Sequence, residues 1–275
     1  MFDLKLLKRI DWFTILLVVG LVTFGLISIA SIMASPFSGE ESSIGDYTAK
    51  LNMVYVNKQT VNFMVGAAAF LIIIVFDYQQ VFKPLIKFAY IGIVGLLVLL
   101  IVMDKTQRGI TGWFVFEAID RAIQPGELCK ICVIIALSKI AIGSGQLYGK
   151  GYFSSGTLAQ LRFVPERHTD FVFAGIVEGV GFVGGVLLIV AFFLLIFRWI
   201  WIAMHAKDYF GMCLVAGCAG MLLAHVFENI GMTIGLMPVT GIPLPFISYG
   251  GSNLLTNMIA VGIVENVWMR RPEKK

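Results

Sequence analysis

The chain has 275 residues, of which 58% are hydrophobic and only 14% are charged, and its mean hydropathy is +0.87. This composition excludes an ordinary soluble domain and is typical of an integral membrane protein. The formal net charge of +4 is explained by basic residues that flank apolar segments, so no nucleic acid is expected as a partner. The expected surroundings are membrane lipids.

Apolar runs near the length of about 20 residues that spans a bilayer predict transmembrane helices. They are Trp12–Met33, Val61–Phe76, Phe88–Met103, Leu128–Ile142, Phe171–Ile200, Phe210–Met232 and Leu254–Trp268. The predicted fold is therefore all-α, a polytopic bundle of about six to seven transmembrane helices in a single domain covering residues 1–275. The first run follows basic residues and is too long for a typical signal peptide, which favours a retained anchor with a cytoplasmic N-terminus.

Leu128–Ile142 is the weakest predicted span, because it is short and carries Lys130 and Lys139. Basic residues near both chain ends place both ends in the cytoplasm, which requires an even number of crossings. We therefore expect Leu128–Ile142 to be a re-entrant or interfacial helix whose two flanking loops are both external.

The loop Gly235–Ser252, with the sequence GLMPVTGIPLPFISYGGS, is irregular backbone between two apolar segments. Prolines block helix propagation and glycines allow conformations that other residues avoid. At membrane depth such backbone is tolerated only where it is buried in protein or lines a watery cavity. The sequence therefore predicts a re-entrant loop that forms a pocket wall, shaped by Pro243, Pro245, Ser248, Tyr249, Gly250 and Gly251.

This loop, preceded by NIGM at residues 229–232, resembles the C-terminal hallmark of the SEDS family, the shape, elongation, division and sporulation proteins RodA, FtsW and SpoVE. The resemblance implies a multi-pass protein of the bacterial cytoplasmic membrane with an extracytoplasmic active face. It implies a peptidoglycan glycosyltransferase that polymerises lipid II into glycan strands by an inverting transfer from a lipid-linked donor. A class B penicillin-binding protein, a transpeptidase, is the implied partner, and elongation and division both remain open as the role.

A second match is QLRFVPERHTDFVFA at residues 160–174. In SEDS proteins the acid of the HTDF motif is regarded as essential, and here it is Asp170. A carboxylate at the lip of an apolar helix is costly unless it is paired, binds a cation or serves chemistry. Asp170 is thus a candidate general base or a ligand of a divalent cation, with a helix cap by Asp170 or Thr169 as the structural alternative.

Three charged side chains near this motif are candidate supporting residues. Arg167 and His168 flank the acid and could contact a pyrophosphate, although a solvated loop charge is an equal alternative. Glu178 corresponds to the first acid of the family's acidic pair, whose second member is Gly179 here, and it is expected to face a cavity or a partner. Arg167 before His168 resembles the RodA branch more than the FtsW branch.

Two further matches are weaker. Lys58 and Gln59 resemble the basic residue and glutamine that begin this helix in the family, with a lysine that extends to the membrane interface as the alternative. Residues 124–127, QPGE, resemble the family's QPSE, with Gly126 in place of serine. Glu127 is a candidate site residue, but a favourable contact with the start of a helix would also explain it.

The chain lacks the QPDLGT-like motif that family members carry after this helix. Here IIALSK at residues 134–139 is followed directly by a sequence that family members carry well downstream of this point. An internal block is therefore predicted to be missing near residues 139–140. Two other functions stay open: an inactive or partner-binding SEDS remnant, and a lipid II transporter (flippase). For a transporter, Glu178 and Glu228 are too few polar residues to line a path across the membrane.

Overall fold

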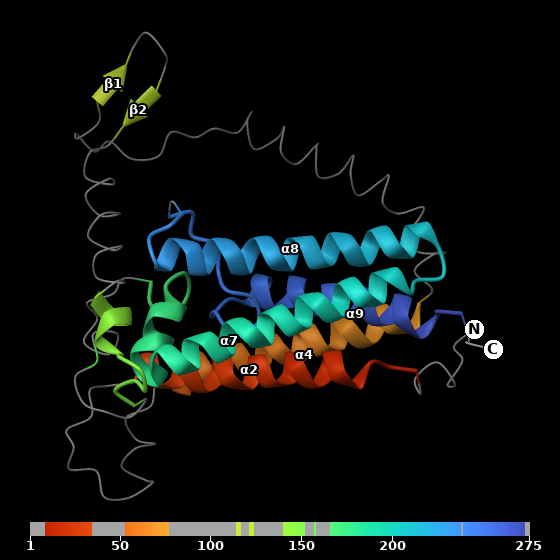
Figure 1. The fold of residues 1–275 in the computed structure, drawn as a ribbon, viewed down its shortest axis with the longest axis horizontal. Coiled ribbons are helices and arrows are strands. Elements are labelled where there is room, and N and C mark those ends of the chain that lie inside the picture. The colour runs from red at the N-terminus through yellow and green to blue at the C-terminus, as the bar shows by residue number, and fades with distance from the viewer. Residues whose placement is uncertain are drawn as a thin grey trace, which may run out of the picture.

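The computed structural model describes residues 9–34, 53–76, 114–116, 121–123, 140–151, 157, 166–237 and 239–272. Over these ranges the chain is a bundle of long helices (Figure 1), which confirms the predicted fold class. The helices are α2 (Trp12–Ile32), α4 (Met53–Val75), α7 (Val172–Met204), α8 (Tyr209–Thr233) and α9 (Gly251–Met269). Two three-residue strands, β1 (Phe114–Phe116) and β2 (Arg121–Ile123), form an antiparallel hairpin that the all-α expectation did not include.

Helices α2, α4, α7 and α8 are each long and apolar enough to cross a membrane. Helix α4 begins at Met53 rather than at Val61, because no glycine or proline interrupts the polar turn that precedes its apolar run. Helix α9 lies where a span was predicted, and most of its residues are buried. The predicted span Phe88–Met103 and residues 128–139 of Leu128–Ile142 lie outside the described residues.

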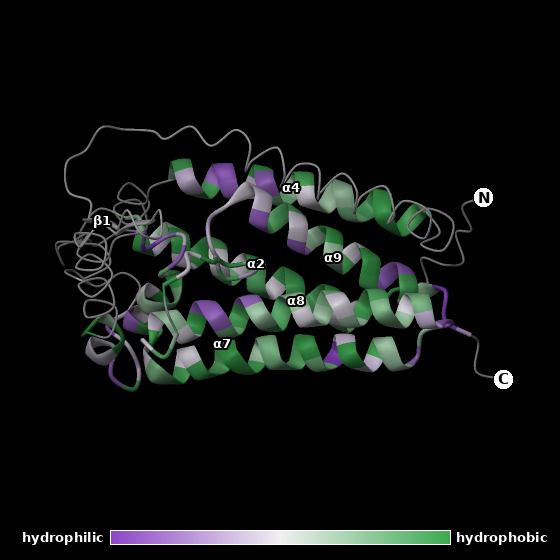
Figure 2. Cartoon of the chain, turned by 90° about the horizontal axis from the view of Figure 1, so that it is seen from above, coloured by the Kyte–Doolittle hydropathy of each residue, from purple (hydrophilic) through white to green (hydrophobic). Residues whose placement is uncertain are grey.

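Arg9 and Arg271, near the two ends of the described part of the chain, lie together at one end of the bundle, which is here called the termini end (Figure 1). There Arg9 Nη2 donates a hydrogen bond of 2.9 Å to the carbonyl oxygen of Arg271. The opposite end, the loop end, carries residues 140–151, 166–171, 234–237 and 239–250 (Figure 1). Helix α4 packs along α9, and α7 packs along α8. Apolar residues dominate the middle of the helices and hydrophilic ones gather toward the two ends (Figure 2).

Helix α7 is two helices joined at a kink, where Gly181 has φ 75° and ψ −176°. A straight helix of 33 residues would be about 50 Å long, far more than the hydrocarbon core requires. The part before the kink, residues 172–179, is buried on all sides, so it lies inside the protein at the loop end. The predicted single span Phe171–Ile200 is therefore interrupted.

A chain segment fills the gap at this kink. The backbone N–H of Phe182 donates to the carbonyl oxygen of Gln146 at 2.8 Å, and that of Gly151 donates to the carbonyl oxygen of Gly179 at 2.9 Å. Backbone groups freed by the break are therefore satisfied within the protein, as membrane depth demands. A Cβ atom on Gly181 would lie 2.2 Å from the backbone nitrogen of Gly149, so this close approach requires glycine.

Candidate functional site

The proline- and glycine-rich loop enters the interior of the bundle, as its sequence predicted. Leu244, Ile247 and Ser248 have no exposed surface. Helix α2 makes room for the loop at Gly25, where a Cβ atom would lie 2.7 Å from the Cα atom of Ile247. Within the same loop Pro245 is buried. The loop is therefore re-entrant and packed in protein.

Asn229, near the end of α8, joins this loop to the segment that contains Asp170. Its side-chain Nδ2 donates two hydrogen bonds of 2.8 Å, one to the carbonyl oxygen of Asp170 and one to the carbonyl oxygen of Ile242. Asn229 is completely buried. Because one buried amide bonds both carbonyls, it fixes the backbone of Asp170 relative to the re-entrant loop.

Ser248 adds a second connection between the two loops. Its hydroxyl donates to the carbonyl oxygen of Thr169 at 2.6 Å and accepts from the backbone N–H of Leu244 at 2.8 Å. The next residue, Tyr249, donates its backbone N–H to the carbonyl oxygen of His168 at 2.8 Å. The re-entrant loop and the segment that contains Asp170 are thus in direct contact.

Helix α4 reaches the same loop through Gln59, which is 1% exposed. Gln59 Nε2 donates to the carbonyl oxygen of Ser248 at 3.2 Å, and Gln59 Oε1 accepts from the backbone N–H of Gly250 at 3.2 Å. The neighbouring Lys58 is exposed. These contacts give Gln59 a positioning role and are compatible with a lysine at the membrane interface.

The Asp170 side chain is half-buried and does not cap a helix. The N-cap of α7 is Phe171, and no side chain bonds the helix start. The other predicted cap, Thr169, donates its hydroxyl to the backbone and carboxylate oxygens of Glu166 instead. The cap alternative is therefore wrong. The Asp170 carboxylate is not used to cap the helix and is available for chemistry.

Burial raises the pKa of the Asp170 carboxyl, and the negative charge of Glu166 raises it further. The carboxylate faces Gly241, at which a Cβ atom would lie 3.3 Å from Asp170 Oδ2. Gly241 has φ 73°, a conformation that strongly favours glycine. Gly241 is exposed and has no side chain that could cover the carboxylate. A carboxylate with a raised pKa in such a place can accept a proton.

The predicted reason for glycine at positions 250 and 251 is wrong. Gly250 has an extended φ of 163°, and a Cβ atom there would make an ordinary contact of 3.6 Å with Asn253. At Gly251 a Cβ atom would lie 3.0 Å from Asn62 Oδ1, which is a packing limit set by a side chain. The conformational requirement falls on Gly241 instead.

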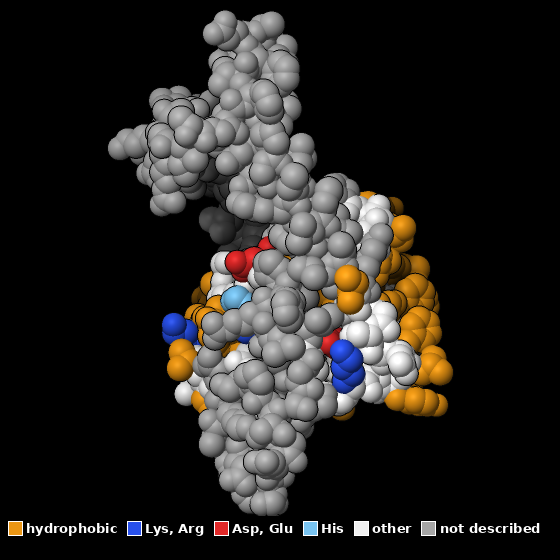
Figure 3. All heavy atoms as spheres, turned by 90° about the vertical axis from the view of Figure 1, so that its left-hand side faces the viewer, with side chains coloured by type: hydrophobic (Ala, Val, Ile, Leu, Met, Phe, Trp, Pro, Cys, Tyr) orange, Lys and Arg blue, Asp and Glu red, His pale blue; other side chains and the backbone are white. Residues whose placement is uncertain are grey.

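An aromatic group lies next to the acid. The His168 ring is 5.2 Å from Tyr55 and 5.7 Å from Tyr249, and the two tyrosine rings are 5.1 Å apart. Burial lowers the pKa of His168, the nearby Glu166 raises it and Arg167 lowers it, and the net direction is downward. A neutral imidazole is therefore favoured. Acidic and histidine side chains are visible together at the loop end (Figure 3).

The remaining predicted residues occupy different places. Arg167 is 6% exposed, so it is not the solvated loop charge that was the alternative. Glu178 is fully buried beside the kink of α7, where Lys150 Nζ lies 3.1 Å from its Oε1 and the Ser144 hydroxyl donates to it at 3.3 Å. This ion pair positions residues 144–150 against α7. Glu127 lies outside the described residues.

Sequence reasoning missed several of these side chains. No role was predicted for Asn229, which lies in one of the matching motifs. A polar amide within an apolar helix is nevertheless a sign of a structural or functional contact. No role was predicted for Glu166, although its negative charge raises the pKa of Asp170. No local pattern announces that Gly241 faces Asp170, because the two residues meet only in the folded chain.

The profile of the FtsW/RodA/SpoVE family, described as cell cycle proteins, matches residues 11–140 and 135–273. The chain belongs to this family. Its curated relatives include the peptidoglycan glycosyltransferase MrdB of Escherichia coli K12, 50% identical over 137 residues, which are 50% of this chain and 37% of MrdB. The stage V sporulation protein E of Bacillus subtilis is 44% identical over 133 residues, 48% of this chain and 36% of that protein. Each match thus spans little more than a third of the relative.

Solved structures of similar fold cover nearly the whole chain. One, reported under the heading of structural coordination of polymerization and crosslinking by a peptidoglycan synthase complex, has a TM-score of 0.64 at 21% identity and covers 94% of this chain and 97% of the other. The rod shape determining protein RodA of Thermus thermophilus has a TM-score of 0.58 at 24% identity, covering 96% of this chain and 98% of the other. At these identities the likeness shows the FtsW/RodA/SpoVE fold.

Proposed function

We propose that this chain is a peptidoglycan glycosyltransferase that polymerises lipid II into glycan strands. The observation that carries the proposal is the half-buried carboxylate of Asp170, whose backbone is bonded through Asn229 to a re-entrant loop. The name of the relative MrdB, which is 50% identical over half of this chain, supports the same activity.

In such a transfer, the acceptor sugar hydroxyl attacks the anomeric carbon of the donor while the bond to the pyrophosphate oxygen breaks. Asp170 takes the proton from the attacking hydroxyl, and its raised pKa makes it a stronger base than an ordinary aspartate. Attack from the side opposite the leaving group inverts the anomeric configuration. Arg167 and His168 adjoin the acid in sequence, and we assign them to the pyrophosphate because a guanidinium matches phosphate geometry.

A divalent cation would have to depend on the substrate for most of its ligands. Within the described ranges, no three side chains of histidine, cysteine, aspartate or glutamate are grouped so that they could hold a metal ion. Asp170 could still serve as a single protein ligand, with phosphate oxygens and water completing the shell. Proton removal by Asp170 does not depend on such an ion.

We also propose an orientation and a partner. The termini end carries Arg9, Lys207, Arg270 and Arg271, and because basic residues favour the cytoplasmic side, we assign Asp170 to the extracytoplasmic face of a bacterial membrane. A class B penicillin-binding protein is the proposed partner, supported by the similar fold found in a peptidoglycan synthase complex. Because the curated matches cover only about a third of each relative, an inactive, partner-binding remnant is the second candidate.

Purified protein in detergent with lipid II and a divalent cation tests these proposals by direct detection of glycan on a gel. Asp170→Asn is expected to lower the rate at least about 100-fold, since a general base contributes that much or more. Asp208→Asn is the matched control, because Asp208 caps α8 at the termini end. Full activity in Asp170→Asn would remove the carboxylate from the mechanism. A wild-type chain that binds the partner and makes no glycan would identify a remnant.

A further inference from the structure

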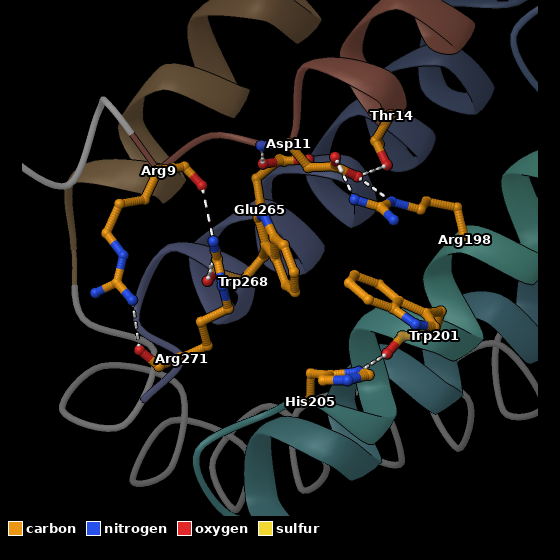
Figure 4. Close-up of polar contacts among 9 residues, drawn as sticks. All are labelled: Arg9, Asp11, Thr14, Arg198, Trp201, His205, Glu265, Trp268 and Arg271. Atoms are coloured by element: carbon orange, nitrogen blue, oxygen red, sulfur yellow. Dashed lines mark hydrogen bonds and ion pairs between the residues drawn. The ribbon is translucent and has the colours of Figure 1, made fainter. Parts of the chain in front are cut away.

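A pocket opens at the termini end, remote from Asp170, and the proposed polymerisation makes no use of it. Its cavity volume is about 760 Å³. The lining combines cationic and aromatic side chains (Figure 4): Arg9, Trp201, His205, Ala206, Trp268, Arg271 and Pro272.

Two arginines are held side by side in this pocket. Arg9 Nη2 donates to the carbonyl oxygen of Arg271 at 2.9 Å, and Arg271 Nη1 donates to the carbonyl oxygens of Arg9 at 3.4 Å and of Trp268 at 2.9 Å. Burial lowers the pKa of Arg271, and the charge of Arg9 lowers it further. Two like charges kept together by backbone contacts make a site that attracts an anion.

Among the described residues, the carboxylates of Asp11 and Glu265 lie nearest to the pocket, and neither residue lines it. Asp11 accepts two hydrogen bonds from Arg198, at 2.7 and 2.8 Å, and one from the Thr14 hydroxyl at 2.8 Å. Glu265 Oε2 accepts the backbone N–H of Asp11 at 2.8 Å. These acids offset part of the positive potential, but the described side chains that an anion in the pocket would meet are arginine and histidine.

The aromatic walls place the pocket at the membrane–water boundary. Trp201 and Trp268 lie in the last turns of α7 and α9, with ring centroids 5.1 Å apart. The Arg271 guanidinium lies 3.5 Å above the Trp268 ring, and the His205 ring is 4.2 Å from Trp201. Tryptophan at helix ends is typical of the interface, where an apolar face and a polar edge are both needed.

We propose that this pocket binds the phosphate-bearing headgroup of an anionic phospholipid from the leaflet at the termini end. Guanidinium groups match the geometry of phosphate oxygens, and basic pockets between transmembrane helices on the cytoplasmic side suit anionic headgroups. The cavity is large enough for a phosphodiester with its glycerol, and the tryptophan rings provide apolar contact for the adjoining part of the lipid.

Native mass spectrometry of the full chain in detergent, titrated with phosphatidylglycerol or phosphatidylcholine, tests the proposal. Wild type is expected to bind phosphatidylglycerol more tightly than phosphatidylcholine. Arg271→Gln and Arg9→Gln are each expected to weaken phosphatidylglycerol binding about fivefold, the value of one basic residue near an anionic surface, and to leave phosphatidylcholine binding unchanged. Lys207→Gln is the matched control, since Lys207 is an exposed cation at the same end outside the lining, and it should change neither.

Several results would overturn the proposal. They are equal affinity of wild type for the two lipids, an effect of Lys207→Gln as large as that of Arg271→Gln, and displacement of the lipid by inorganic phosphate at similar concentration, which would identify a soluble phosphate site. Arg9 also bonds the backbone of Arg271, so its replacement can alter the local structure. Arg271→Lys therefore serves as a second variant. It keeps the charge and loses the planar fork, and it should retain part of the lipid preference with an unchanged melting temperature in phosphatidylcholine.

Discussion

Replacement of Asn229 by alanine tests whether the contact between the two loops is needed for catalysis. The buried Nδ2 of Asn229 bonds the carbonyl oxygens of Asp170 and Ile242, each at 2.8 Å. The substitution removes both bonds and leaves two acceptors unpaired in the protein. We expect the Asp170 backbone to lose its fixed position relative to the re-entrant loop.

The expected magnitude follows from the two bonds. Each contributes about 1 kcal/mol net, so their loss costs about 2 kcal/mol. If this cost falls on the arrangement that presents Asp170 to substrate, the polymerisation rate drops by up to about 30-fold, at 1.36 kcal/mol per factor of ten. The assay is the glycan-forming rate of purified protein with lipid II, with the melting temperature measured in parallel.

Asn257→Ala is the matched control, because Asn257 is also a buried asparagine and its side-chain amide bonds Asn253 one turn earlier in α9. It should lose stability without a comparable loss of rate. A normal rate in Asn229→Ala, or equal rate losses in both variants at equal melting temperatures, would refute the argument that this amide positions the acid.

Three further predictions follow from the same geometry. Gly241→Ala should reduce the polymerisation rate, because φ is 73° there and the added Cβ atom would lie 3.3 Å from Asp170 Oδ2; an unchanged rate would show that this face of the acid is unused. Glu166→Gln removes a charge that raises the pKa of Asp170, so the fall of the rate on acidification should move to lower pH, whereas an unmoved limb would mean that another group titrates. In a cysteine-free background, Tyr148→Cys should react with an impermeant reagent in intact cells and Tyr209→Cys should not, although the two side chains are 82% and 84% exposed; the reverse pattern would invert the proposed orientation.

The helices were predictable from sequence because each is a long apolar run, and the re-entrant loop because prolines and glycines exclude a helix there. The kink in α7 was not predicted. Gly181 was one of several small residues in an apolar stretch, and only the docking of residues 145–151 reveals which glycine breaks the helix. A local pattern cannot specify such a partner.

The candidate site, too, was predictable in part from the sequence. Motif resemblance pointed to Asp170 and to the loop containing Ser248, and the structure brings their backbones together. The contribution of each side chain could not be read from the sequence, because it depends on burial and on distant residues. Gln59 connects α4 to the re-entrant loop by hydrogen bonds, whereas Glu178 forms an ion pair with Lys150 at the kink of α7.

The arrangement of the described helices also bears on the question of how often the chain crosses the membrane. Helix α4 ends at the termini end, where Asn266 of α9 bonds the carbonyl oxygen of Phe76. Residues 140–144 lie at the loop end, where Ser144 bonds Glu178. The chain between Phe76 and Ile140 therefore leads from one end of the bundle to the other, which takes an odd number of crossings.

Two spans were predicted in that interval, Phe88–Met103 and Leu128–Ile142, and an odd number allows only one of them to cross. Phe88–Met103 is uninterrupted by charge until its end, whereas Leu128–Ile142 carries Lys130 and Lys139, whose burial in lipid is costly. The expectation that Leu128–Ile142 is re-entrant or interfacial fits this odd number, and it stays a prediction because residues 88–103 and 128–139 lie outside the described part of the chain.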